Sequence, residues 1–186
     1  GASGQTVPVL GVGGAALVLM PVGNRAAGEA LRPGVHHLTL QSATLDDAIA
    51  AVAVAGIEIA PPQPALHGRS AVELSAEKLG GIRLFLSESP DLPKVTPGPV
   101  ERIDHIGVAS ADNRAALAMY CDRLGFALES RQTDREIATT METFSSDRYG
   151  VVRHSRPAVV VGGLHVAFVT IGDCELEFLE NFNPDQ

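Results

Sequence analysis

Polar and apolar residues alternate along several short segments of the chain, as they do in strands with one buried face. In residues 35–42, two leucines fall on one face of the predicted strand and polar side chains on the other. Thr44 is a typical helix N-cap, and a helical pattern follows it as far as Gly56, a natural residue to end a helix. Three more strands are predicted, over residues 57–60, 70–76 and 82–88. The order is therefore strand, helix, strand, strand, strand.

The same order begins again after a proline-rich stretch, residues 89–101, which we interpret as a stiff linker. A strand is predicted over residues 102–110, and a helix from Asp112 to Leu124 is ended by Gly125. The remaining strands are predicted over residues 126–132, 164–172 and 174–182. The chain thus repeats one supersecondary unit, as a duplicated module does.

The two copies of this unit can be aligned on their first and last strands. His37 matches His105, and Phe85 matches Glu177. From the histidine to the helix-ending glycine is 19 positions in the first copy (37 to 56) and 20 in the second (105 to 125). We therefore predict an α+β fold built from a pair of βαβββ modules.

The predicted modules cover residues 31–88 and 102–186, and residues 1–30 are interpreted as the last strands of a partial module. The second module is the longer one, because an insert at about 133–163 lies between its strands. The insert is polar and contains Arg148 and His154. We interpret it as a lid that faces the substrate; a disordered surface loop is the alternative.

Composition and charge narrow the classes of function. Hydrophobic residues make up 45% of the chain and charged residues 19%, as in a globular protein. The formal net charge of -8, without a cluster of Lys or Arg, opposes binding to nucleic acid. The most apolar stretch, residues 7–22, is interrupted by glycines and too short to span a membrane. Cys121 and Cys174 lie far apart, which favours two thiols in the cytoplasm over a disulfide.

The repeat resembles the vicinal oxygen chelate superfamily, which includes glyoxalase, methylmalonyl-CoA epimerase and the extradiol-type dioxygenases. The first module carries the likeness in GVHHLTL, AGIEI and GGIRLFL, and the second in RIDHIGVAS, YCDRLGF and ELEFLE. The resemblance implies a glyoxalase-like fold whose paired modules form an open, cup-shaped mixed sheet around a divalent metal ion. The two types of module occur here in the reverse of the epimerase-like order. The chain is therefore part of a longer multi-module protein, pairs its modules across a homodimer, or is permuted.

Carried over position by position, the resemblance implies His37, His105 and Glu177 as ligands of Fe, Mn, Co, Ni or Zn. Phe85 stands where a fourth ligand is expected, so we assign it to the substrate side of the site. Imidazole and carboxylate are the ligands that a metal site without thiolates requires. We expect His36 to lie on the opposite face of its strand from the ligands.

His165 matches the position of a catalytic glutamate in the epimerase-like members, so we predict that it removes a proton next to a substrate carbonyl. Arg148 and His154 of the insert are predicted to contact the substrate.

Three functions fit this set of residues. The first is an isomerase or lyase that acts on a small carbonyl compound or thioester through a metal-stabilised enolate. The second is a non-haem Fe(II) dioxygenase, for which two histidines and one carboxylate leave coordination sites open. The third is a small-molecule binding protein of the same fold without catalysis. For all three we expect no nucleic-acid and no membrane partner.

Overall fold

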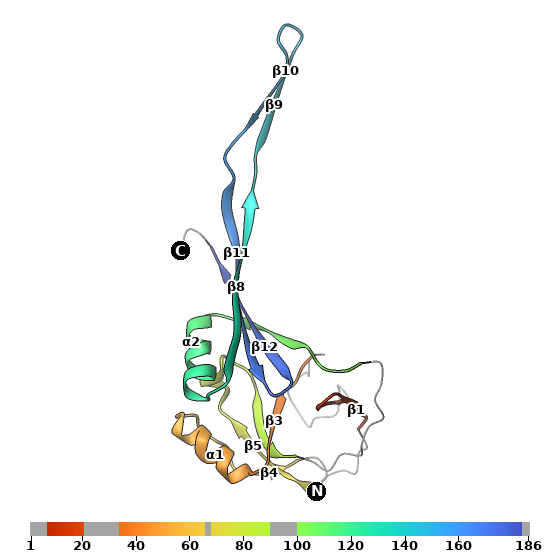
Figure 1. Cartoon of the computed structure of the whole chain (residues 1–186), viewed down its shortest axis with the longest axis vertical. Coiled ribbons are helices and arrows are strands. Elements are labelled where there is room, and N and C mark those ends of the chain that lie inside the picture. The colour runs from red at the N-terminus through yellow and green to blue at the C-terminus, as the bar shows by residue number, and fades with distance from the viewer. Residues whose placement is uncertain (1–6, 21–33, 66–67, 90–99, 184–186) are drawn as a thin grey trace, which may run out of the picture.

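The computed structural model describes residues 7–20, 34–65, 68–89 and 100–183, and two four-stranded sheets dominate it (Figure 1). The elements of the first module are β3 (Leu38–Ser42), α1 (Leu45–Val54), β4 (Gln63–Pro64), β5 (Ser70–Leu74), the 3-10 helix η2 (Ala76–Leu79) and β6 (Leu84–Glu88). Its strands lie in the order β3-β6-β5-β4. β3 is parallel to β6, and the other neighbours are antiparallel.

The second module repeats this topology. Its elements are β7 (His105–Ser110), α2 (Asn113–Leu117), the π-helix η3 (Ala118–Arg123), β8 (Ala127–Ala138), β11 (Val159–Ile171) and β12 (Cys174–Phe182). The strand order is β7-β12-β11-β8, again with the first and last strands parallel. The predicted α+β fold with paired βαβββ modules is confirmed.

Both helices begin and end where the sequence predicts. The carboxylate of Asp112 caps α2 by accepting a hydrogen bond of 3.0 Å from a backbone N–H of the first turn. Thr44 precedes α1 in an extended conformation, and its hydroxyl donates to the Asp47 carboxylate at 2.6 Å. Gly56 and Gly125 follow the two helices with φ angles of 77° and 76°, which favour glycine.

One predicted strand is wrong. Residues 57–60 form only a single β-bridge, between Ile59 and Leu74. Pro61 and Pro62 follow directly, and neither has a backbone N–H to extend a ladder. The fourth strand of this sheet is instead the short β4.

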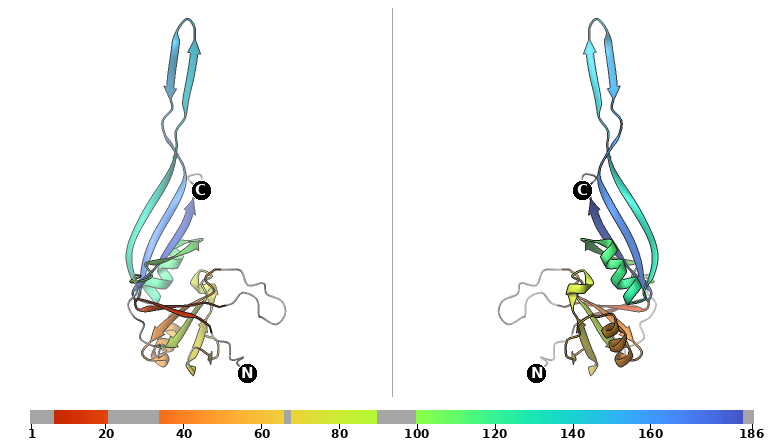
Figure 2. Two further views of the ribbon diagram at one scale, coloured as in Figure 1. Left: turned by 90° about the vertical axis from the view of Figure 1, so that its right-hand side faces the viewer. Right: turned by 90° about the vertical axis from the view of Figure 1, so that its left-hand side faces the viewer.

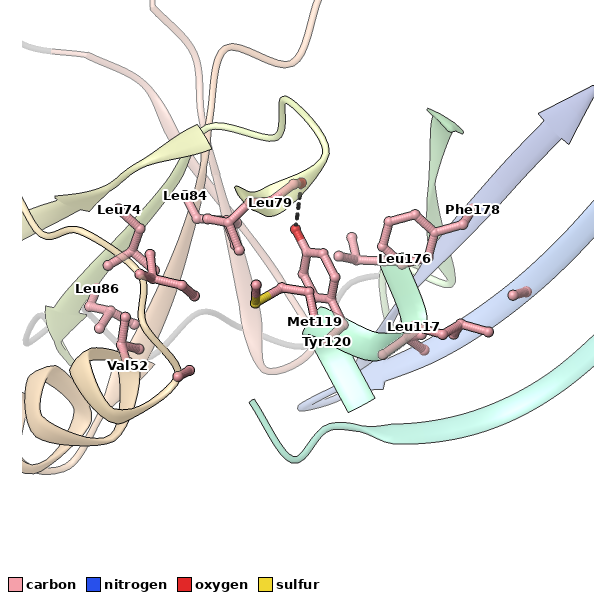
Figure 3. Packing of buried hydrophobic residues seen from close by; sticks show 14 of the residues in the cluster. Val52, Leu74, Leu79, Leu84, Leu86, Leu117, Met119, Tyr120, Leu176 and Phe178 are labelled. Atoms are coloured by element: carbon pink, nitrogen blue, oxygen red, sulfur yellow. Dashed lines mark hydrogen bonds between the residues drawn. The ribbon is translucent and has the colours of Figure 1, made fainter. Parts of the chain in front are cut away.

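One hydrophobic core joins the two modules (Figure 3). Alternate residues of each sheet enter it, such as Leu84 and Leu86 of β6, together with Leu176 of β12. Tyr120 of η3 has no exposed surface there, and its hydroxyl donates a 3.1 Å hydrogen bond to the carbonyl of Leu79. Because the core also contains side chains of both helices, each sheet turns its helix-covered face inward and its other face away.

The second module carries a long two-stranded arm that extends away from both modules (Figures 1 and 2). β12 ends opposite Gly163 of β11, so β8 and β11 continue without a third strand. The hairpin closes through β9 (Met141–Ser146) and β10 (Gly150–Ser155). Residues 136–162 are called the arm below. The insert thus forms a hairpin and not a disordered loop.

A short hairpin, β1 (Val9–Val12) with β2 (Ala15–Val18), precedes the first module. The N–H of Gly14 in its turn donates to the carboxylate of Asp173 at 2.8 Å, which ties the hairpin to the turn between β11 and β12. That residues 1–30 belong to a partial module stays a prediction. Residues 1–6 and 21–30, and residues 90–99 of the predicted linker, lie outside the described residues.

In the described part of the chain, no helix is both long enough and apolar enough to cross a membrane. Cys121 and Cys174 are free, half-buried thiols. Burial raises the pKa of both thiols, so neither is activated as a nucleophile.

Candidate functional site

His105 and Glu177 lie side by side on the helix-free face of the second sheet. β7 and β12 are parallel neighbours whose register places Glu177 opposite Gly107, two residues along from His105. The Nε2 atom of His105 is 3.5 Å from Oε2 of Glu177. Their side chains are 44% and 17% exposed, so a ligand can reach both from this face.

Asp104 holds the other nitrogen of the His105 ring. Its Oδ2 lies 3.1 Å from Nδ1 of His105, and its carboxylate also forms an ion pair with Arg102. The hydrogen bond from His105, and then the Arg102 guanidinium, lower the pKa of the Asp104 carboxyl. A carboxylate on Nδ1 fixes the proton there and leaves the Nε2 lone pair directed toward Glu177.

The separation of these two atoms suits a shared metal ion. Donors bonded to one first-row ion at about 2.0–2.2 Å, at a roughly tetrahedral angle, lie about 3.4 Å apart. Nε2 of His105 and Oε2 of Glu177 are 3.5 Å apart. The residues present therefore fit two of the ligands of a divalent ion.

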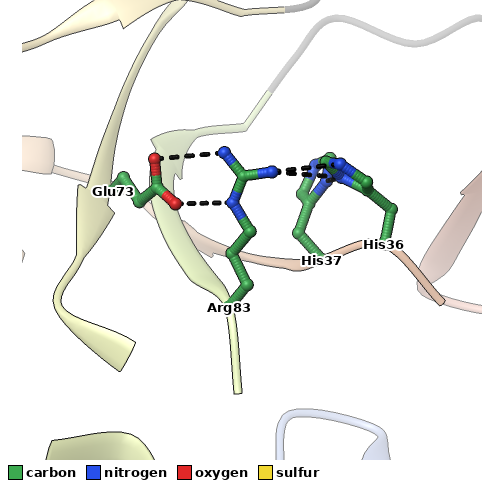
Figure 4. A network of polar contacts seen from close by, with 4 residues as sticks. All are labelled: His36, His37, Glu73 and Arg83. Atoms are coloured by element: carbon green, nitrogen blue, oxygen red, sulfur yellow. Dashed lines mark hydrogen bonds and ion pairs between the residues drawn. The ribbon is translucent and has the colours of Figure 1, made fainter. Parts of the chain in front are cut away.

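His37 belongs to a separate cluster in the first module (Figure 4). Its Nδ1 lies 2.8 Å from Nδ1 of His36, so one ring donates a proton and the other accepts it. Nη1 of Arg83 lies 3.0 Å from Nε2 of His36. The same guanidinium donates to both carboxylate oxygens of Glu73, at 2.5 and 3.3 Å.

The prediction that His36 lies on the opposite face from His37 is wrong. β3 begins only at Leu38, so strand alternation does not extend to these two residues. His37 also packs against the ring of Phe85, with 4.8 Å between centroids. Burial, followed by the nearness of His36 and Arg83, lowers the pKa of His37. This lowered pKa favours the neutral imidazole, the form that binds metals.

The three predicted ligands do not converge within one chain. Among the described residues, no group of three or more His, Cys, Asp or Glu side chains is placed to hold a metal ion. The structure brings His105 and Glu177 together and leaves His37 apart. The shared core explains this, since it lies on the helix-covered side of both sheets and the ligand positions lie on the other side.

Residues 102–186 match the family model of the Glyoxalase/Bleomycin resistance protein/Dioxygenase superfamily. Over this module the chain is similar to the glyoxalase superfamily. The matched segment contains His105 and Glu177, the pair whose geometry suits a metal ion. No curated protein matched the chain.

Solved structures of the glyoxalase superfamily are similar to this chain at low identity. A glyoxalase/bleomycin resistance protein/dioxygenase domain from Frankia sp. EAN1pec is 13% identical, with a TM-score of 0.41 over 82% of this chain and 100% of that one. A glyoxalase family protein from Enterococcus faecalis is 15% identical, with a TM-score of 0.40 over 80% and 98%. A mutant of the fosfomycin resistance protein FosX from Listeria monocytogenes, complexed with Mn(II), is 12% identical, with a TM-score of 0.38 over 80% and 93%. At these values the likenesses assign no role to a residue of this chain.

His165, the predicted base, lies on the opposite face of the second sheet from His105 and Glu177. In the register of β11 with β12, His165 pairs with Glu180, whereas Phe168 pairs with Glu177. The two positions on β11 differ by three, an odd number, so their side chains point to opposite faces. The His165 ring stacks on Phe182 at 4.5 Å. The prediction that His165 acts at the metal ligands is therefore not supported by its position.

Of the residues predicted to contact substrate, Phe85 is the one beside a candidate ligand. It is 8% exposed and lies next to His37 on the helix-free face of the first sheet. Arg148 and His154 lie on the arm, which extends from the opposite end of β8 and β11 to the His105 and Glu177 pair. Within one chain the arm is not a lid over this pair.

The sequence reading missed three polar residues around the candidate ligands: Asp104, Glu73 and Arg83. Asp104 directly precedes His105, and a carboxylate next to a predicted ligand is a signal for a residue that orients it. Glu73 lies directly across from Phe85. Alternation along residues 70–76 would have placed Glu73 on that face.

Proposed function

We propose that the chain is a metal-dependent enzyme of the vicinal oxygen chelate type, in which His105 and Glu177 form half of a divalent-metal site. The 3.5 Å approach of Nε2 to Oε2, on an accessible sheet face, carries this proposal. It is supported by the match of the same module to the glyoxalase superfamily. Fe, Mn, Co, Ni and Zn all bind such a ligand set, so the metal is left open.

The remaining ligand comes from His37 of a second copy of the chain, so the active form is a homodimer. Two ligands alone hold a metal ion weakly, and both sheet faces in question point away from the core of their own chain. Burial lowers the pKa of His37 and so favours the neutral ring, the form that binds metals. The site is then shared between two chains by the twofold symmetry that most homodimers have.

The reaction class that suits this site is isomerisation or lysis of a small carbonyl compound or thioester. A bound divalent ion supplies a Lewis acid that polarises the substrate carbonyl. The chain itself contributes an apolar flank beside each histidine. Phe168 lies 6.0 Å from the His105 ring and Phe85 lies 4.8 Å from the His37 ring, centroid to centroid. These rings bind the carbon skeleton and exclude water next to the ligands. His165 has no part in this proposal.

Mixing two inactive variants tests the shared site. We expect that His37→Ala and His105→Ala each abolish stoichiometric Co(II) binding, measured by the visible spectrum of the bound ion. When the two variants are unfolded together and refolded, mixed dimers contain one intact site, and binding returns to roughly a quarter of the wild-type value for random pairing. No recovery on mixing would contradict a site shared between chains.

The reaction class is tested by exchange of the α-proton of candidate carbonyl substrates in D₂O, followed by NMR. Metal-loaded wild type is expected to accelerate exchange, and Glu177→Ala to remove the acceleration. If metal binds and no α-proton exchanges with any substrate of this class, the site is intact and the proposed reaction is wrong.

A dioxygenase is the second candidate, and Phe85 favours it. This buried phenylalanine occupies the sheet position equivalent to Glu177, so the first module offers no fourth ligand there. A site with two histidines and one carboxylate keeps coordination positions open for oxygen and substrate. Oxygen consumption by the Fe(II)-loaded protein with a catechol would support this function over the isomerase. If neither activity is found while ligands bind, the protein is a binding module.

A further inference from the structure

The arm exposes large apolar side chains that no described part of the chain covers. Ile137, Met141, Phe144 and Tyr149 are between 57% and 68% exposed, and valines of the returning strand are exposed as well. An isolated two-stranded ribbon is marginally stable in water. A ribbon with this much exposed apolar surface is stabilised when another surface packs on it.

The charges of the arm are separated by strand. The outgoing half, residues 136–147, has three acidic residues and no Lys or Arg, whereas the returning half, residues 148–162, has three arginines and no acidic residue. The formal net charge of the arm is therefore zero, and the rest of the chain carries the whole formal net charge of -8. Two copies can therefore meet arm against arm without net electrostatic repulsion between the arms.

The separation of charge selects one arrangement of two arms. When two ribbons stack face to face with the twofold axis along the arm, each acidic strand lies over the arginine-bearing strand of the other copy. If the two arms stack in opposite directions, each acidic strand lies over the acidic strand of the other copy. If they pair side by side about a twofold axis, two acidic strands or two arginine-bearing strands meet at the edge. On the face of Phe144, Glu142 forms an ion pair with Arg156 of its own arm, whereas Arg153 projects from the opposite face. The parallel stack is the arrangement that sets Glu142 of one copy on the side of Arg156 of the other.

The face that packs is identified by Phe144 and Val152. They are paired across β9 and β10 and so project from the same face of the ribbon. No other pair in this register joins two large apolar side chains. We propose that two copies of this chain associate through their arms, stacked face to face and parallel, with each Phe144 over the partner's Val152.

The size of the arm sets the strength of this contact. The arm has 27 residues (136–162), and roughly half of them project from one face, fewer than the about 20–30 residues that each partner of a standard interface contributes. Two-stranded ribbons twist strongly, so stacked arms wind around each other with the same two faces in contact. We therefore expect a dimer that dissociates on dilution. This contact does not depend on the proposed metal site, because His105 and Glu177 lie at the other end of the second sheet and His37 lies in the first module.

Sedimentation velocity of the full chain over a range of concentrations tests the contact. Phe144→Glu places a carboxylate in the packed face and is expected to raise the dissociation constant at least about tenfold, because an unpaired charge is costly to bury. Thr143→Glu makes the same change of charge at the next residue, on the opposite face, and is expected to change it by less than about threefold. Phe144→Ala should weaken association in the same direction without an added charge.

The direction of the arms is tested with spin labels at the tip. Tyr149→Cys, in a background of Cys121→Ser and Cys174→Ser, is labelled with a nitroxide and its distance to the partner's label is measured by pulsed EPR. Parallel stacking predicts roughly 10–25 Å, from the ~10 Å spacing of packed sheets and the label length. Arms in opposite directions would separate the labels by roughly 40 Å or more, at ~3.3 Å per residue.

The proposal is wrong if the wild type stays monomeric at high concentration, or if the two glutamate variants associate equally. It is also wrong if the labels at the tips are far apart in the associated form. His105→Ala should leave the label distance unchanged, whereas Phe144→Glu should remove it and leave His105 and Glu177 in place. Failure of the arm contact can therefore be told apart from failure of the proposed metal site.

Discussion

The two modules share one topology but exchange a carboxylate and a phenylalanine between neighbouring strands. On the helix-free face of the first module, Phe85 of the last strand lies opposite Glu73 of the third. In the second module, Glu177 of the last strand lies opposite Phe168 of the third. The first module thus has its carboxylate one strand further from its histidine.

This exchange changes what each histidine can do. Next to His105 the carboxylate of Glu177 is left without an arginine partner among the described ion pairs, and the pair is spaced for a metal ion. In the first module Arg83 takes both oxygens of Glu73, and His37 packs against Phe85 instead. The two modules therefore differ by one exchange between adjacent strands: it leaves the proposed metal half-site in the second module and an ion-paired cluster without net charge in the first.

The modules hold their histidines through the same ring atom but in opposite tautomers. In each, the preceding residue contacts Nδ1, from Asp104 to His105 at 3.1 Å and from His36 to His37 at 2.8 Å. Asp104 accepts the Nδ1 proton of His105, which leaves the Nε2 lone pair for a ligand. Arg83 donates to Nε2 of His36, so His36 donates from Nδ1 to Nδ1 of His37 and the proton of the neutral His37 ring lies on Nε2. His37 can therefore serve as the third ligand of the proposed site only when this proton leaves Nε2.

The largest expected effect comes from placing a carboxylate at position 85. Phe85→Glu should lower the free energy of unfolding by about 2–4 kcal/mol, because it buries a charge directly across from Glu73. Urea unfolding measures this, with Phe85→Leu as a control that should cost less than about 1.5 kcal/mol. Added Co(II) should restore part of the loss in the glutamate variant if the introduced carboxylate pairs with His37. If Phe85→Glu is as stable as Phe85→Leu, the exchange of carboxylate and phenylalanine between the two modules has no consequence for stability.

A smaller effect is expected from the titration of His37. Burial lowers its pKa from the model-compound value of 6.5, so the folded state favours the neutral ring. This contribution to stability is complete above the unfolded-state pKa and is lost as the pH falls from there through the folded-state pKa. Between pH 7.5 and 5.5 the wild type should therefore lose more unfolding free energy than His37→Gln. Glu73, whose pKa Arg83 lowers, titrates below this window. Equal losses in both proteins would show that the burial of His37 has no consequence for stability.

Much of the fold follows from local patterns in the sequence. The repeat, the caps at Thr44 and Asp112 and the glycines after both helices are short-range signals, and the structure has these elements where they were expected. The nearness of His105 and Glu177 also follows, because parallel first and last strands are a property of the repeated unit.

The packing of one module on the other does not follow from the repeat. Alignment of His37 with His105 says that they are equivalent, and equivalence does not decide which faces of the two sheets meet. The core side chains around Tyr120 decide this, and they depend on contacts between distant parts of the chain. For this reason His37 does not lie beside His105 and Glu177 within one chain, contrary to the prediction.

The position of His165 could have been predicted. The tight turn at Gly172 and Asp173 pairs Ile171 with Cys174. Counting back from such a turn places His165 opposite Glu180 and on the other face from Glu177. Turn geometry carried information that alternation within a single strand did not.

Titration of Co(II) into wild type and Glu177→Ala, followed by the visible spectrum of the bound ion, tests most directly whether His105 and Glu177 form a metal half-site. Loss of this ligand should lower the affinity at least about 100-fold, while Glu129→Ala, an exposed glutamate on β8, should leave it unchanged. If Glu177→Ala binds the ion as tightly as the Glu129 control does, the pair is not a metal site and the proposed function is wrong.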